Sequence, residues 1–334
     1  MADFQQPATG NRSNPLTPQP LCTALRTALS KGVEGVLRWR IVSSCIIIVV
    51  LVVACWLDFA FNFNRPGVWL LPICFIVCWL ATVELIELLS AKYAQSSSRW
   101  AHLGVLGIYL PPIVPLLAYG YIPGQTEFRL QWIVLGVAFA VMVAFVRELI
   151  AYQQPGGVVS RIALALFSMI YVGLLGSFLA ALRTFQGNEW GMLALLSMIV
   201  VVKLSDIGAY TAGHLFGRHK LAPILSPGKT VEGFIGGLVA GCVGSWIMLH
   251  MLATHFVGQQ LVSATPWKCI LYGALLTLAG LLGDLCESLI KRDVQQKDSS
   301  RRLPGFGGIL DLTDSLVFAA PTAFAFWQFG VFGP

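Results

Sequence analysis

The stretch IVSSCIIIVVLVVACWLDFAF, residues 41–61, is the first of a series of long apolar runs that decide the fold class. A helix of about 20 apolar residues is long enough to cross a hydrocarbon core of about 30 Å. Runs of similar length follow it along a chain of 334 residues that is 56% hydrophobic and 11% charged. This composition excludes a soluble globular protein and indicates a chain that crosses a membrane several times.

The apolar runs predict nine membrane-spanning helices. A transmembrane β-barrel would need short segments of alternating polarity, whereas these runs are continuous. The third run contains three prolines, which would kink a helix but are tolerated inside a helical bundle. We therefore expect an all-α fold, a polytopic transmembrane helical bundle. The predicted spans are residues 41–61, 67–89, 103–121, 131–151, 160–182, 191–210, 232–254, 268–290 and 315–333.

Residues 1–40 differ in composition from the rest of the chain. They are rich in Pro, Thr, Gln, Ser and Asn, which is typical of a disordered tail. Beyond the tail we expect N-terminal transmembrane helices at residues 41–190 and a C-terminal region at 191–334 that carries the chemistry. The C-terminal region contains two long charged loops, residues 211–231 and 291–314.

Lysine and arginine are concentrated in the segments that share the tail's side of the predicted topology. By the positive-inside rule, this asymmetry places the N-terminus and both long loops in the cytoplasm. In a bacterium the membrane would be the inner, or plasma, membrane. The formal net charge of +6 follows from this topology, so we expect no nucleic-acid partner.

The seventh predicted span carries a stripe of glycines. Gly233, Gly237 and Gly241 are spaced four residues apart in the sequence GFIGGLVAGCVG. Small residues at this spacing lie on one face of a helix and let a neighbouring helix approach closely. We expect this face to pack against another span.

Two pairs of acidic residues lie beside the last two predicted spans. Asp284 and Glu287 share one face of the eighth span, and Asp311 and Asp314 repeat the spacing at the start of the ninth. Four carboxylates brought together would repel one another unless a cation lies between them. Oxygen ligands without His or Cys favour Mg²⁺ over zinc. The alternative is a set of structural ion pairs with neighbouring lysines or arginines.

The loop between these acids is basic and rich in glycine. Guanidinium and ammonium groups suit phosphate oxygens, and a Gly-Gly turn lets backbone N–H groups approach a ligand. Contact with anionic lipid headgroups is the alternative for such a loop. The residues concerned are Lys291, Arg292, Lys297, Arg301, Arg302, Gly307 and Gly308.

Residues 225–233, LSPGKTVEG, form a second candidate phosphate site before the seventh span. A turn there would present Ser226, Lys229 and Thr230. The segment is not a P-loop, because Pro223 stands where the first glycine of that motif would fall. The alternative is a plain helix start with Thr230 as the N-cap.

These motifs, in this order, resemble those of the CDP-diacylglycerol synthases, or phosphatidate cytidylyltransferases. The match is close over residues 200–320. The family's C-terminal signature and the preceding G-D-x2-E-S are matched by Gly283, Asp284, Glu287, Ser288, Lys291, Arg292, Lys297, Asp298, Leu303, Pro304, Gly307, Gly308, Asp311 and Asp314. Two earlier blocks of the family are matched by Asp206, Gly208, Ala209, Tyr210, Gly213, Phe216, Gly217, Ser226, Pro227, Lys229, Thr230, Glu232 and Gly233.

Two positions depart from the family pattern. Phe306 stands where the family usually has His, and Leu312 stands where it usually has Arg. Phe306 cannot transfer a proton, so no essential role of a histidine carries over to it. The cation missing at position 312 would have to come from Arg301 or Arg302.

The resemblance implies an enzyme that transfers the CMP moiety of CTP to phosphatidic acid, giving CDP-diacylglycerol and pyrophosphate for phospholipid synthesis. It implies catalytic roles for Asp284, Lys291, Arg292 and Asp311, and binding of Mg²⁺ by Asp284, Glu287, Asp311 and Asp314. The substrate-binding residues that it implies are Asp206, Ser226, Lys229, Thr230, Glu232, Ser288, Lys297, Asp298, Arg301, Arg302, Gly307 and Gly308.

The partners expected from the resemblance are CTP, phosphatidic acid, membrane lipid and a second copy of the chain in a homodimer. Two other functions stay open at this point. One is a CTP-dependent kinase of a prenol or lipid alcohol, which would transfer the γ-phosphoryl group. The other is an ion-coupled transporter, which would carry its charges on broken helices near the middle of the membrane.

Overall fold

The computed structural model describes residues 42–93, 98–110, 113, 126–257, 265–300, 302–303 and 307–332. The predicted N-terminal tail, residues 1–40, lies outside these ranges. Eight helices in the described part are long and apolar enough to cross a membrane. They are Val42–Ala60, α2 Leu70–Ser90, α5 Thr126–Ala151, the continuous α6 Val158–Ser168, η1 Met169–Leu174 and α7 Leu175–Arg183, α8 Asn188–Phe216, the continuous α9 Val231–Trp246, η2 Ile247–Leu252 and α10 Ala253–Val257, α11 Pro266–Asp293, and α12 Ile309–Gln328.

These helices coincide with eight of the nine predicted spans. The remaining one, residues 103–121, coincides with α3, Ser98–Tyr109, which is 12 residues long and ends just before Pro111. Most of the chain between α3 and α5 lies outside the described residues. The prediction of an all-α, polytopic transmembrane bundle is confirmed.

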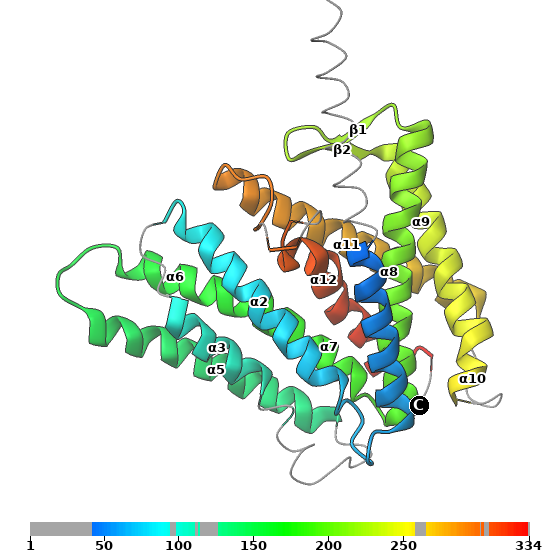
Figure 1. The fold of residues 1–334 in the computed structure, drawn as a ribbon, viewed down its shortest axis with the longest axis horizontal. Coiled ribbons are helices and arrows are strands. Elements are labelled where there is room, and N and C mark those ends of the chain that lie inside the picture. Colours follow the sequence, from blue (N-terminus) through cyan, green and yellow to red (C-terminus); the bar gives the residue numbers. More distant parts are fainter. Residues whose placement is uncertain are drawn as a thin grey trace, which may run out of the picture.

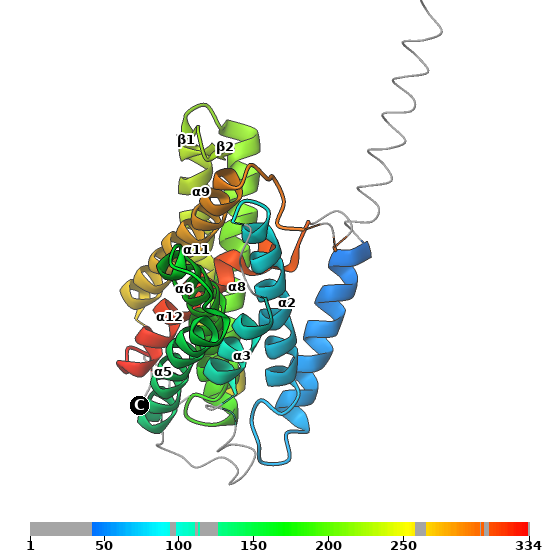
Figure 2. The ribbon, with the colours of Figure 1, turned by 90° about the vertical axis from the view of Figure 1, so that its left-hand side faces the viewer.

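The helices run side by side and successive long helices point in opposite directions (Figures 1 and 2). The C-terminal ends of α8 and α11 and the N-terminal ends of α9 and α12 therefore meet at one end of the bundle. The end of α2 is fastened there too, since Lys92 Nζ lies 2.9 Å from Asp293 Oδ1. This hydrogen bond raises the pKa of Lys92.

A two-stranded hairpin projects from the same end of the bundle (Figure 1). Strands β1, Lys220–Ala222, and β2, Ser226–Thr230, pair antiparallel between α8 and α9. The sequence predicted a charged loop at residues 211–231, but α8 continues to Phe216 and most of the remaining chain forms the hairpin. Glu232 fastens its base by accepting hydrogen bonds from the backbone N–H groups of Arg218 and His219, at 3.1 and 3.2 Å.

The glycine stripe of α9 packs as the sequence predicted. A Cβ placed on Gly237 would lie 3.0 Å from the Ser205 carbonyl oxygen and 3.1 Å from Ala209 Cβ, both on α8. Gly241 faces α11, where the Gly273 carbonyl oxygen would lie 3.3 Å from an added Cβ. The stripe therefore brings α9 against two helices that line the candidate site.

A buried ion pair braces the opposite end of the bundle. Arg183 Nε, at the end of α7, donates to Asp58 Oδ2 of the first described helix at 2.5 Å, and neither side chain is exposed. Asp58 also accepts from the backbone N–H groups of Gly67 and Trp69, at 3.0 and 2.8 Å. Removing one partner of such a pair would leave a buried charge uncompensated.

The α8–α9 contact generates a stability prediction. Gly237→Leu would force the two helices apart, and overpacking of this kind costs about 1–3 kcal/mol. Val239→Leu is the matched control, because Val239 lies on the same helix and is 58% exposed on the opposite side. We expect Gly237→Leu, but not Val239→Leu, to lower the unfolding temperature of the protein in detergent. Equal shifts would contradict the packing described here.

Candidate active site

A cavity of about 730 Å³ opens at the end of the bundle that carries the hairpin. Side chains of α8, β2, α9, α11 and α12 line it. Five of the described lining residues are carboxylates and three are lysines, an excess of two negative charges. The carboxylates are Asp206, Asp284, Glu287, Asp311 and Asp314, and the lysines are Lys203, Lys229 and Lys291.

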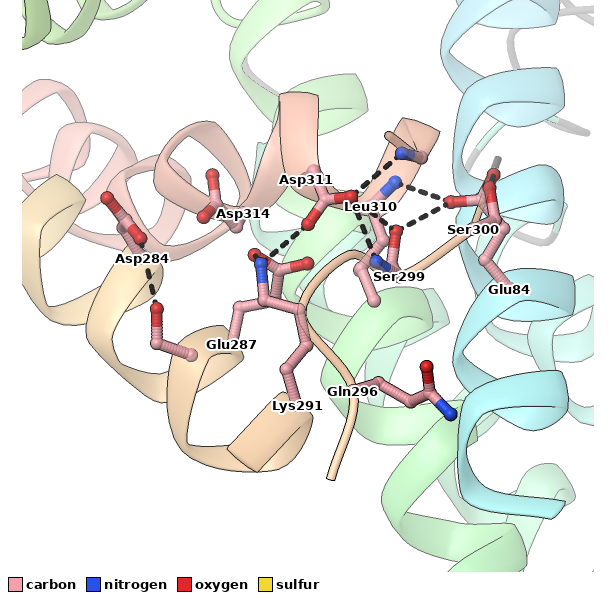
Figure 3. A network of polar contacts seen from close by, with 12 residues as sticks. Glu84, Asp284, Glu287, Lys291, Gln296, Ser299, Ser300, Leu310, Asp311 and Asp314 are labelled. Atoms are coloured by element: carbon pink, nitrogen blue, oxygen red, sulfur yellow. Dashed lines mark hydrogen bonds and ion pairs between the residues drawn. The ribbon is translucent and has the colours of Figure 1, made fainter. Parts of the chain in front are cut away.

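Three of the carboxylates form one cluster. Asp284 and Glu287 come from α11 and Asp314 comes from α12, and each offers an oxygen within 4.8 Å of the others. Glu287 and Asp314 are 1% and 6% exposed, whereas Asp284 reaches further toward solvent. Figure 3 shows these side chains facing one another across the contact of the two helices.

The chemistry of this cluster fits a divalent cation. Glu287 Oε1 is buried and has no hydrogen-bond partner within the described residues. Leaving a buried oxygen unsatisfied is costly, and three carboxylates this close repel one another. A hard cation such as Mg²⁺ prefers an all-oxygen set of ligands and would relieve both penalties.

Asp311 lies beside this cluster and is held by protein donors. Its Oδ1 accepts from Lys291 Nζ at 2.6 Å. Its Oδ2 accepts from the backbone N–H groups of Ser299 and Gly308, at 3.0 and 2.7 Å, and from Ser299 Oγ at 2.8 Å. The structure thus gathers three of the four predicted metal ligands, and a metal-binding role for Asp311 stays a prediction.

The lysines of the cavity each pair with an acid, which is the alternative that the sequence left open. Lys291 Nζ bridges Glu287 Oε2, at 2.8 Å, and Asp311 Oδ1. Lys229 Nζ lies 2.7 Å from Asp284 Oδ2. The pairs join β2, α11 and α12 around the cavity, so these cations are positioned at its edge and remain within reach of a ligand.

Lys203 lies beside the backbone of position 312, where the family pattern would have an arginine. Its Nζ lies 3.4 Å from the carbonyl oxygen of Leu312 and 3.2 Å from Asp206 Oδ2. Arg302, one of the predicted replacements, instead pairs with Glu87 on α2 at 2.5 Å. Arg301, the other, lies outside the described residues, as does Phe306. The cation found beside position 312 therefore comes from α8.

The segment LSPGKTVEG divides between the cavity and the start of α9. Ser226, Gly228 and Lys229 line the cavity. Thr230 does so as well, and its Oγ1 also accepts a hydrogen bond from the Gly233 N–H at 3.1 Å, which makes it the N-cap of α9. The helix-cap interpretation of Thr230 is confirmed.

The predicted catalytic residue Arg292 and several predicted substrate-binding residues lie outside the cavity lining. Arg292 Nε donates to the Leu225 carbonyl oxygen at 3.2 Å, so it fastens the hairpin turn to α11. Ser288 Oγ contacts Asp284 Oδ1 at 3.5 Å from the next turn of the helix. Lys297 and Asp298 are exposed after the end of α11. Substrate contacts by these residues, and by Glu232 at the hairpin base, stay predictions.

The two glycines of the signature shape the loop before α12. Gly307 has a φ of +92°, a conformation that favours glycine, and its N–H donates to the Leu303 carbonyl oxygen at 3.2 Å. The Gly308 N–H donates to Asp311 Oδ2, the acidic half of a capping box. Both N–H groups predicted to meet a ligand are thus bonded within the protein.

Sequence reasoning missed Glu84, which lies on α2 and contacts the loop between α11 and α12, residues 294–308, here called the signature loop. Its side chain is fully buried and accepts hydrogen bonds from Ser299 Oγ, Ser300 Oγ and the Leu310 N–H. The available signal was a carboxylate inside an apolar span, a position that is costly and usually functional.

The unsatisfied oxygen of Glu287 leads to a test of metal binding. A cation that binds only the folded protein raises its stability by about 2.7 kcal/mol at 100 times the dissociation constant. We expect Mg²⁺ to raise the unfolding temperature of the wild type and to have little effect on Glu287→Gln. Glu87→Gln is the control, because Glu87 is an exposed acid on α2. An equal effect of Mg²⁺ on Glu287→Gln and on the wild type would contradict the assignment.

Comparison with known proteins identifies the family. The model of the cytidylyltransferase family matches residues 38–329. The phosphatidate cytidylyltransferase of Mycobacterium bovis is 33% identical over 266 residues, which cover 75% of this chain and 79% of that protein. The protein of the same name from Mycobacterium tuberculosis H37Rv is also 33% identical, over 75% of this chain and 74% of its own.

A shorter match has higher identity. The phosphatidate cytidylyltransferase of Staphylococcus haemolyticus is 43% identical over 159 residues, covering 48% of this chain and 56% of that protein. Together with the eight long apolar helices, these matches make the chain an integral membrane protein. The family model spans nearly the whole described bundle, including the cavity and its carboxylates, and the chain belongs to the cytidylyltransferase family.

Proposed function

We propose that this protein transfers the CMP moiety of CTP to phosphatidic acid, giving CDP-diacylglycerol and pyrophosphate. The observation that carries the proposal is the cluster of Asp284, Glu287 and Asp314 in a cavity that three lysines also line. The relatives of this chain are named phosphatidate cytidylyltransferases. A site with excess negative charge can accept an anionic nucleotide only together with a cation. A divalent ion bound with the nucleotide would meet this requirement.

The reaction needs little acid–base chemistry from the protein. A phosphate oxygen of the lipid attacks the α-phosphorus of CTP, and the bond from that phosphorus to the bridging oxygen breaks. Pyrophosphate leaves with the bonding electrons. The attacking phosphate is already ionised at neutral pH, so catalysis consists mainly of positioning and charge neutralisation. A phenylalanine at position 306 is compatible with this chemistry.

The residues of the cavity divide between metal and phosphate. Asp284, Glu287 and Asp314 would hold Mg²⁺, which when bound neutralises phosphate oxygens and helps to orient the nucleotide. Lys229, on β2, and Lys203, on α8, both line the cavity and would donate to the triphosphate. Lys291, held between two carboxylates, would stabilise the charge that grows on the departing pyrophosphate.

The site faces the cytoplasm in this proposal. Lys92, Lys220 and Lys297 lie near the cavity end of the bundle, consistent with the positive-inside rule. Phosphatidic acid would reach the cavity from the inner leaflet, since Phe234, Gly237 and Leu281 extend its lining toward the apolar part of the bundle. Assembly into a homodimer stays a prediction.

The two alternative functions are not favoured. The family match and the names of the relatives favour cytidylyl transfer over phosphorylation of a prenol or lipid alcohol. The described acids and lysines of the cavity lie on β2 or in the halves of α8, α11 and α12 nearest the hairpin. A transporter of the expected kind would carry them on broken helices near mid-membrane.

The decisive assay uses purified protein in detergent with Mg²⁺, phosphatidic acid and CTP labelled in the α-phosphate. We expect labelled CDP-diacylglycerol and an equal amount of pyrophosphate. Asp284→Asn should lower kcat by about 100-fold or more, because the charge it removes acts directly on the transition state. Asp293→Asn is the control, since Asp293 lies on the same helix at an exposed ion pair. Release of CDP, or an Asp284→Asn variant with normal kcat, would overturn the proposal.

Lys203 gives a second test through the missing arginine. We expect Lys203→Met to lower kcat/KM for CTP by about tenfold, the equivalent of about 1.4 kcal/mol. Adding Leu312→Arg should restore part of the loss, because the new guanidinium would start from the backbone position that Lys203 now contacts. A double variant no more active than Lys203→Met would contradict the idea that Lys203 replaces the missing arginine of position 312.

A further inference from the structure

Glu84 is a buried carboxylate for which the proposed reaction has no use so far. It lies on α2, a helix that does not line the cavity among the described residues. Its side chain is 0% exposed inside an apolar span, where a charged group costs about 2.5–3.5 kcal/mol. A residue this costly calls for a compensating role.

The partners of Glu84 distinguish it from the other fully buried carboxylate at the far end of the bundle. Asp58 is neutralised by Arg183 at 2.5 Å. In the described part of the chain, Glu84 is instead met by two hydroxyls and one amide. Its Oε1 accepts from Ser300 Oγ at 2.7 Å, and its Oε2 accepts from the Leu310 N–H at 2.9 Å and from Ser299 Oγ at 3.2 Å.

These contacts join the signature loop and the start of α12 to α2. Leu310 lies in the first turn of α12, where backbone N–H groups have no partner within the helix and favour a negative charge. Ser299 and Ser300 lie in the loop that connects α11, which ends at Asp293, to α12. Glu84 therefore holds the chain that leaves α11 and the chain that enters α12 at one point.

A line of polar contacts runs from Glu84 to the carboxylate cluster (Figure 3). Ser299 Oγ lies between Glu84 Oε2, at 3.2 Å, and Asp311 Oδ2, at 2.8 Å. Asp311 Oδ1 in turn accepts from Lys291 Nζ at 2.6 Å, and the same ammonium group reaches Glu287 Oε2 at 2.8 Å. The Ser299 hydroxyl has a single hydrogen, which the two carboxylates share. Its 2.8 Å contact with Asp311 is of normal O–H···O length, and its 3.2 Å contact with Glu84 is longer.

Gly308 provides the space for this arrangement. A Cβ placed there would lie 3.0 Å from Glu84 Cδ and would collide with Ser299 Oγ. A larger residue at position 308 would therefore push Glu84 and Ser299 apart. The close approach of Glu84 and Ser299 to position 308 therefore explains why the family signature has a glycine there.

We propose that Glu84 is a positioning residue that acts through Ser299 and Asp311 to fix the ammonium group of Lys291 at the cavity edge. The inference rests on the proposed cytidylyl transfer. A lysine side chain is flexible, so the place of its charge depends on the two carboxylates that hold it. One of them, Asp311, is oriented by Ser299, and Ser299 is oriented by Glu84.

The test compares Glu84→Ala with Glu84→Gln. Alanine removes every acceptor at position 84, so Ser299 Oγ loses its contact with α2. Asp311 then keeps its backbone donors, but the link through which Ser299 orients it toward Lys291 is loosened. We expect kcat per folded protein to fall roughly 10- to 100-fold, the scale of a misplacement of about 1 Å. KM for CTP should change little, because the lost interaction is with charge that develops in the transition state.

Glutamine should rescue the reaction. Its carbonyl oxygen can accept from Leu310 and Ser299, and its amide can donate to Ser300 Oγ, so kcat should stay within about threefold of the wild type. A role of Glu84 in stability alone predicts a lower unfolding temperature with unchanged kcat. Asp58→Asn is expected to behave in that way and serves as the structural control.

Glu87→Ala is the matched control on the same helix. Glu87 contacts the same segment through Arg302, but it does not touch Ser299 or Asp311 in the described structure. Its kcat should equal that of the wild type. A loss of kcat in Glu87→Ala as large as in Glu84→Ala would overturn the specific link.

Ser299→Ala keeps the test decisive if Glu84→Ala does not fold. It breaks the link and leaves Glu84 with its other two partners, so its kcat should fall as in Glu84→Ala. Amide hydrogen exchange gives a readout independent of catalysis. Exchange at Ser299, whose N–H donates to Asp311, should accelerate in Glu84→Ala and not in Glu84→Gln.

The outcomes separate this inference from the proposed function. If the wild type makes no CDP-diacylglycerol, the proposed function fails, and the exchange measurement still reports on the link. If the wild type is active and Ser299→Ala has normal kcat, the positioning role of Glu84 is wrong and the proposed function stands.

Discussion

The site depends on the close contact of α11 with α12 at the level of the carboxylates. A Cβ at Gly283 would lie 2.5 Å from the Asp314 carbonyl oxygen and 2.8 Å from Phe318 Cβ. This approach brings the acidic face of α11, with Asp284 and Glu287, against Asp314 at the start of α12. Acids on facing helix surfaces repel one another unless a nearby cation or the uptake of a proton reduces their charge. Lys291 supplies one such cation, and in the proposed reaction a metal ion bound with the nucleotide would compensate the rest.

The remaining elements position groups around this contact. The glycine stripe of α9 lets it pack between α8 and α11, which sets the distance from the hairpin to the acids. The hairpin then delivers Lys229 to Asp284, and α8 delivers Lys203 to the backbone of α12. From the N-terminal half, α2 fastens the signature loop through Glu84. In the proposed reaction, a bound cation would offset both the excess of acids in the cavity and the negative charge of the substrates.

The sequence predicted the features that depend on local composition and spacing. The long apolar runs could be recognised by their length. The glycines of α9 and the acids of α11 and α12 could be recognised because helical periodicity places each set on one face. The links between distant segments were not predictable, since Glu84 and Ser300 are separated by 216 positions and share no local pattern. The hairpin was missed because β1 has three residues and its neighbour contains Pro227 and Gly228, which are poor strand formers. Likewise, only packing could show that Lys291 lies at the cavity and Arg292 beside the hairpin turn.

A direct test of the account is to locate a divalent ion in the protein bound to CTP, with Mn²⁺ in place of Mg²⁺ and anomalous scattering to identify it. The account predicts an ion among the carboxylates of Asp284, Glu287 and Asp314, with oxygens of the nucleotide completing its coordination. An ion bound at other residues, or a nucleotide bound with no ion beside Glu287 Oε1, would contradict the central claim.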